Sequence, residues 1–125
     1  MARVELTQNK GPEVIESLSP TDSITANTPL YGPIVNVRLY TLHSYQVLNN
    51  SGSSITFYII GSNYADSDGN PSTDYGTHWT TISQHTVSAG NSLAYSDVWN
   101  FKYASIMVQC ASTIQDVSVY EKHNA

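Results

Sequence analysis

The stretch between residues 55 and 79 limits most what this chain can fold into. Apolar side chains at Ile55, Phe57 and Ile59 alternate with other residues, which is the two-residue period of a β-strand. The strand ends at Gly61, and a loop rich in Asn, Asp, Ser, Gly and Pro fills residues 63–76. The pattern predicts β-structure interrupted by one long polar loop.

Similar short strands recur from residue 34 onward, separated by turn residues at 50–53 and 89–91. Their spacing of about 8–12 residues is typical of sandwiches, and no stretch has helical spacing. We therefore predict an all-β fold: a single antiparallel β-sandwich, jelly-roll-like. The expected strands are 34–42, 44–49, 55–60, 79–83, 84–88, 93–99, 101–110 and 113–120. The expected core is Val35, Val37, Leu39, Ile55, Phe57, Ile59, Trp79, Ile106, Val108, Val117 and Val119.

The first 33 residues have a different pattern, with four of the five prolines and no sustained periodicity. Proline density keeps a segment off central strands. We predict an extended N-terminal arm over residues 1–33 and a sandwich domain over residues 34–125, so that deleting residues 1–29 leaves the sandwich folded. A loosely packed leader is the alternative. The arm's apolar residues are candidate protein contacts: Val14, Ile15, Leu18, Ile24 and Leu30.

Charge excludes some partners. The net charge is −5, and the five Lys and Arg residues are scattered, so no basic stripe for nucleic acid or anionic membrane can form. Only 12% of the residues are charged, whereas nine are Tyr, which suits half-apolar contact surfaces. We expect Tyr40, Tyr64 and Tyr75 to contact protein, and we expect a homo-oligomer, either a trimer or a dimer.

No catalytic, metal or cofactor site is predicted. The four histidines (His43, His78, His85 and His123) lack metal-ligand spacing and are expected at the surface. Residues 66–70 resemble the start of a calcium loop, but a turn explains the same residue types. No G-x-S-x-G elbow or phosphate loop occurs, so we expect no enzyme. The single cysteine, Cys110, is expected to be buried and inert.

The order of several short motifs is similar to that in a known class of proteins. Ile60-Gly61-Ser62-Asn63 ends one strand, and Thr77-His78-Trp79 follows the loop. Val87-Ser88-Ala89-Gly90 forms a turn, and Phe101-Lys102-Tyr103-Ala104 begins a strand that continues through Ile106–Cys110. This order resembles small β-sandwich structural proteins of tailed bacteriophages, and the likeness covers residues 55–120, about half of the chain.

The resemblance implies a non-catalytic virion structural protein. Its first expectation is a capsid decoration (cement) protein that binds and stabilises the assembled phage head. The alternative is a receptor- or carbohydrate-binding module of a tail or fibre. The implied partner is the major capsid protein or another virion protein. The implied location is the capsid surface, after synthesis in the host cytoplasm.

Overall fold

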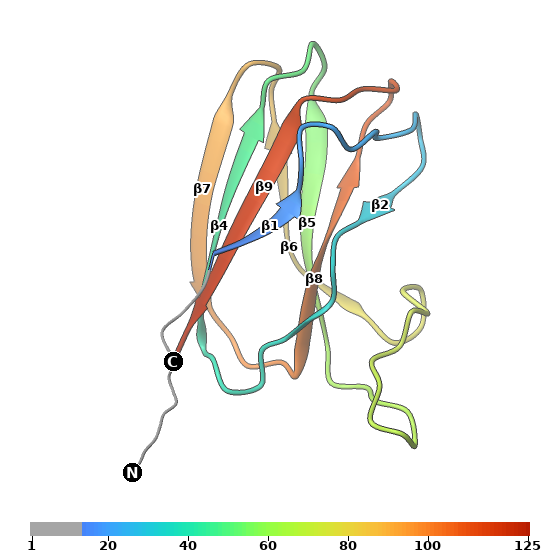
Figure 1. Cartoon of the computed structure of the whole chain (residues 1–125), viewed down its shortest axis with the longest axis vertical. Helices are drawn as coiled ribbons and strands as arrows, with labels where there is room; N and C mark the ends of the chain where they lie inside the picture. The colour runs from blue at the N-terminus through green and yellow to red at the C-terminus, as the bar shows by residue number, and fades with distance from the viewer. Residues whose placement is uncertain (1–13) are drawn as a thin grey trace.

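The computed structural model describes residues 14–125 and confirms an all-β sandwich without helices in that range (Figure 1). Its strands are β1 (Val14–Leu18), β2 (Leu30–Tyr31), β3 (Val35–Asn36), β4 (Leu42–Asn49), β5 (Ile55–Ser62), β6 (Thr80–Val87), β7 (Ser92–Val98), β8 (Tyr103–Gln109) and β9 (Val117–Asn124). Across these residues, no helix is long and apolar enough to cross a membrane.

Two antiparallel sheets pack face to face. One has the strand order β1-β9-β4-β7, and the other has the order β2-β8-β5-β6, with β3 also pairing with β8. Only β2 to β3 and β5 to β6 stay within one sheet, whereas every other connection crosses between the sheets. If β2 and β3 count as one broken edge strand, this is the eight-strand arrangement of a jelly roll.

The inner faces carry the core that alternation predicts. Eight of the eleven predicted core residues are buried: Val37, Ile55, Phe57, Ile59, Ile106, Val108, Val117 and Val119. Val35 and Trp79 are half-buried. Leu39 is a wrong prediction, since 72% of it is exposed. The expected strand over residues 34–42 is broken by a turn in which the Tyr40 N–H donates to the Val37 carbonyl, and this turn directs Leu39 outward.

Residues 14–33 are continuous with the sandwich. Strand β1 pairs with β9, and β2 pairs with β8, so this segment contributes to both sheets. Between them, Ile24 forms a two-way backbone bridge with Ile114 at 2.9 and 3.0 Å. Leu18 and Ile24 are buried in the core, and Leu30 packs against it. Part of the predicted arm therefore lies inside the domain, and residues 1–13 lie outside the described part.

Asn49, the last residue of β4, ties two turns together from a fully buried position. Its side-chain Nδ2 donates to the carbonyls of Ser53 and Val87 at 2.8 and 2.9 Å. Its Oδ1 accepts from the Ser51 hydroxyl at 2.6 Å. Its carbonyl accepts from the N–H of Gly90, whose φ of 77° is one that glycine adopts without strain. One amide thus joins the β4–β5 turn to the β6–β7 turn.

Cys110 lies just beyond the end of β8 and is buried, as predicted. Its Sγ is 3.4 Å from the carbonyl of Ser54, which precedes β5. Since Cys110 is the only cysteine of the chain, no intrachain disulfide is available to staple the fold. Hydrogen bonds and core packing within and between the two sheets hold it instead.

Candidate binding surfaces

The long loop between β5 and β6, residues 63–79, has a defined conformation. The Ser62 hydroxyl donates to the His78 carbonyl at 2.6 Å, and the Trp79 indole donates to the Ser72 carbonyl at 2.9 Å. The Tyr103 hydroxyl, at the start of β8, donates to the Gly69 carbonyl at 3.0 Å. These bonds fasten the loop to itself and to the sheet, and it projects from one end of the sandwich (Figure 1).

Aromatic rings gather on this loop in two stacks. Tyr64 stacks on His78 with ring centroids 3.7 Å apart, and Tyr75 stacks on Tyr31 of β2 at 3.8 Å. The Trp79 ring lies beside the second stack, with its centroid 5.5 Å from that of Tyr75 and its plane tilted by 40°. A cleft of about 140 Å³ opens beside it, and no charged side chain lines it. Its lining residues are Tyr31, Ile60, Tyr75, Gly76, Trp79, Thr80, Thr81 and Met107.

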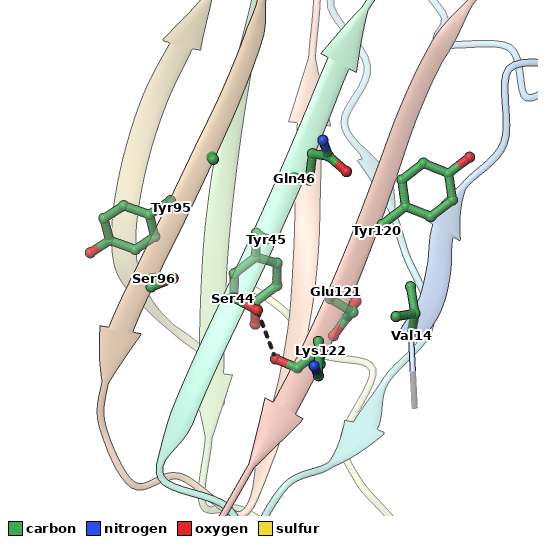
Figure 2. A pocket seen from close by; sticks show the side chains of 10 residues that line it. Val14, Ser44, Tyr45, Gln46, Tyr95, Ser96, Tyr120, Glu121 and Lys122 are labelled. Atoms are coloured by element: carbon green, nitrogen blue, oxygen red, sulfur yellow. Dashed lines mark hydrogen bonds between the residues drawn. The ribbon is translucent and has the colours of Figure 1, made fainter. Parts of the chain in front are cut away.

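A second depression, of about 270 Å³, lies on the outer face of the β1-β9-β4-β7 sheet (Figure 2). Small side chains at Ser44, Ala94 and Ser96 leave space along β4 and β7. Tyr120 and Lys122 of β9 border it on the side of β1. The surface is therefore mostly uncharged and continuous over all four strands.

Exposed apolar side chains extend this outer face toward one end. Leu42 of β4 and Val98 of β7 are direct partners across the ladder and are 41% and 70% exposed. Leu39, in the turn that leads into β4, is 72% exposed, and Val14 at the start of β1 is 65% exposed. We call Leu39, Leu42 and Val98 the apolar edge patch. Contiguous exposed apolar side chains are a feature of interaction sites, so this patch is a candidate contact surface.

The structure separates the predicted contact residues into two groups. Leu18 and Ile24 are buried, and Leu30 packs against the core, so these three side chains serve the chain's own interior. Five others reach the surface to some degree: Val14, Ile15, Tyr40, Tyr64 and Tyr75. Of the surface group, Tyr64 and Tyr75 lie together on the aromatic loop, and Val14 borders the outer depression.

Two histidines correct the surface prediction, because His43 and His123 are buried. They form a polar chain with Glu121, which is also buried, and Ser17 donates its hydroxyl to Glu121. The alternation itself could have located part of this chain, since two-residue steps from Val117 and Val119 lead to Glu121 and His123. Because the last strand was predicted to end at residue 120, the alternation was not followed as far as Glu121 and His123.

The buried chain contains Ser, His and Glu but not the geometry of a catalytic triad. In a triad the imidazole accepts the serine proton, and a carboxylate orients that imidazole. Here the Ser17 hydroxyl is bonded to Glu121 itself, and both side chains are buried. A second pair, Ser72 and His78, is 2.7 Å apart on the loop, where the His78 ring is stacked on Tyr64.

The acidic loop at residues 66–70 has the geometry of a turn. The Asp66 carboxylate accepts the N–H groups of Asp68 and Asn70, both at 2.9 Å, and Gly69 has a φ of 81°. Between residues 14 and 125, no three His, Cys, Asp or Glu side chains are grouped so as to hold a metal ion. The turn accounts for the acidic residues without a ligand.

No protein-family model matches the chain, and no curated protein matches its sequence.

Proposed function

We propose that this protein is a non-catalytic virion structural protein that decorates an assembled phage head. The observation that carries the proposal is the apolar edge patch, which adjoins a sparsely charged outer sheet face. Assembled shells offer large, permanent surfaces, and permanent interfaces have more apolar cores than transient ones. Jelly rolls also occur among viral capsid domains, although a fold alone does not specify a function.

Copy number and location test this proposal. Particles purified from a lysate would be digested, and this chain would be quantified against the major capsid protein by mass spectrometry. A decoration protein is expected in many copies, with antibody label spread over the head. Few copies confined to the tail would contradict the proposal, as would absence from the particles.

Polar substitutions in the apolar edge patch should weaken binding to particles without preventing folding. We expect Leu42→Ser with Val98→Ser to weaken attachment to particles at least tenfold, because about 1.4 kcal/mol of lost binding free energy is tenfold in affinity. Attachment would be measured by co-sedimentation with stripped particles, and unfolding by urea titration.

The matched control is Gln84→Ser with Thr86→Ser, two exposed positions on β6 of the opposite sheet that do not line the aromatic cleft. That variant should bind and unfold like the parent chain. Equal attachment of the patch variant and the control would remove the patch from the interface.

The aromatic cleft favours a second candidate, a carbohydrate-binding module. Sugar rings stack on aromatic faces through their apolar C–H surfaces, while their hydroxyls hydrogen-bond to neighbouring polar groups. The cleft offers Tyr75 and Trp79 as rings and Thr80 and Thr81 as hydroxyls, with no charge. A neutral sugar is therefore the ligand class that this cleft would suit.

If the cleft binds sugar, Trp79→Ala should lower the affinity for a neutral oligosaccharide found on a glycan array by about tenfold or more. Tyr64→Ala is the control, because Tyr64 belongs to the other stack and does not line the cleft. Titration calorimetry with that oligosaccharide would measure both variants. An array without saturable binding would end this second candidate.

A further inference from the structure

A continuous chain of hydrogen bonds crosses the buried side of the β1-β9-β4 sheet. The Glu121 Oε1 lies 2.7 Å from the His123 Nε2. The His123 Nδ1 lies 2.7 Å from the His43 Nδ1, and the His43 Nε2 lies 3.1 Å from the Trp99 carbonyl oxygen. The chain therefore connects β9, β4 and the connection between β7 and β8.

This chain of hydrogen bonds needs one proton more than two neutral imidazole rings supply. Both ends, the Glu121 carboxylate and the Trp99 carbonyl, accept hydrogen bonds. Three contacts lie between these two acceptors and require three protons, whereas two neutral imidazoles carry two. Without a third proton, two lone pairs face each other at one contact and Glu121 is a buried charge without a counterion, which is costly.

We propose that these residues form a proton clasp, in which the folded protein holds one shared proton that completes all three hydrogen bonds. The proton belongs to the coupled chain rather than to one residue. With it, the clasp has no net charge and joins three parts of the sheet. A second extra proton would place two N–H groups head to head between the rings, so the clasp holds one and excludes the next. This inference is independent of the proposed function.

The surroundings agree with this count. Burial lowers the pKa of His43, the Trp99 carbonyl opposes that effect, and the neighbouring His123 lowers the pKa further. The lowered pKa of His43 favours the arrangement in which His43 donates from Nε2 to the Trp99 carbonyl and accepts at Nδ1 from His123. The shared proton then lies between His123 and Glu121. Asp97 also acts on His43 and raises its pKa, as Glu121 does.

Two further groups face the clasp. The buried phenol of Tyr45 stays protonated, because burial and the nearby Glu121 raise its pKa. The hydroxyl of Ser17 donates to the other oxygen of Glu121 and ties β1 to the clasp. Neither group competes for the shared proton.

The difference in bound protons between the unfolded and folded chains determines how stability changes with pH. In an unfolded chain each imidazole is half protonated near pH ~6.5, so the two together then bind about one proton, as the clasp does. Above that pH the unfolded chain binds fewer protons than the folded chain, and stability falls as pH rises. Below it the unfolded chain binds more, and stability falls as pH falls. The clasp therefore stabilises the fold most near pH ~6.5.

The variant Glu121→Gln tests the proton count. Its amide can donate an N–H to His123 and still accept from Ser17, so it supplies the missing hydrogen in a form that does not titrate. Urea unfolding of the full chain would be measured from pH 5.5 to 9. In the parent chain the unfolding equilibrium constant should rise with pH above 7, by up to about tenfold per unit for one proton. In Glu121→Gln that alkaline rise should disappear, whereas the acidic loss of stability should remain.

The control is Glu16→Gln, an exposed carboxyl on the neighbouring strand β1, which should keep the parent profile. Nitrogen-15 NMR of the parent chain at pH 7.5 gives a second readout that does not need the variant to fold. His43 should carry a proton on Nε2 alone, His123 should carry one on Nδ1, and the shared proton should lie between the His123 Nε2 and Glu121. Two neutral buried rings beside an ionised Glu121, or an equal alkaline rise in Glu121→Gln and the parent, would overturn the proposal.

Discussion

A chain that starts at Leu30 is expected not to fold. Deleting residues 1–29 removes β1 and the buried side chains of Leu18 and Ile24. Losing each such side chain costs about 2–5 kcal/mol, and ordinary domains are stable by only about 5–15 kcal/mol. The deletion also takes the Ser17 hydroxyl from Glu121 and exposes the edge of β9. Circular dichroism and amide NMR dispersion should both report an unfolded chain.

Single substitutions distinguish the loss of these packed side chains from the loss of chain length. Ile24→Ala should lower the free energy of unfolding by about 2–5 kcal/mol, whereas Val14→Ala, at an exposed position, should change it by less than about 0.5 kcal/mol. A truncated chain with a parental cooperative urea transition would show that residues 14–29 are dispensable. That result would restore the interpretation of this segment as an arm separate from the sandwich.

Asn49→Asp is expected to destabilise the protein more than Asn49→Ala does. A carboxylate oxygen would replace the amide Nδ2 and face the carbonyls of Ser53 and Val87, which lose this donor and meet a negative charge instead. Each unsatisfied group costs about 1–3 kcal/mol, and the buried negative charge adds to this loss. We expect at least about 3 kcal/mol at pH 7 by urea titration.

The loss in Asn49→Asp should shrink as the pH falls toward 5, because the neutral acid can donate one hydrogen bond in place of the amide. Asn50→Asp, an exposed neighbour in the same turn, is the control and should change stability by less than about 0.5 kcal/mol. If both variants lose the same stability, the side-chain bonds of Asn49 do not hold the two turns together.

Alternation alone predicted much of this fold. The strand at residues 55–60 lies within β5, and the strand at 101–110 contains β8. The turns around Ser51 and Gly90 are also where residue type indicated them. Local patterning succeeds here because burial alternates with the two-residue period over residues 55–59 of β5 and 106–109 of β8.

The predictions failed where contacts between residues far apart in the sequence determine strand pairing and burial. Prolines suggested that residues 14–33 lie apart from the sandwich, yet pairing with β8 and β9 places strands β1 and β2 in the two sheets. His43 and Glu121 look like surface residues individually. His43 is buried against His123, 80 positions away, and against the Trp99 carbonyl, and Glu121 is buried against Ser17, 104 positions away. Single-residue polarity cannot reveal such pairs, since the partners meet only after the strands have assembled.

Modification of the single thiol measures how often the folded protein opens locally. Cys110 is only 6% exposed beside the Ser54 carbonyl at the junction of β8 and β5, at the edge of a depression that Ser54 and Gln109 also line, so a thiol reagent in solution reaches it fully only when that junction separates. The rate of modification then follows the population of opened molecules rather than ordinary surface reactivity. Any assembly that clamps the two strands would slow this reaction, and a single added mass would count the molecules that had opened.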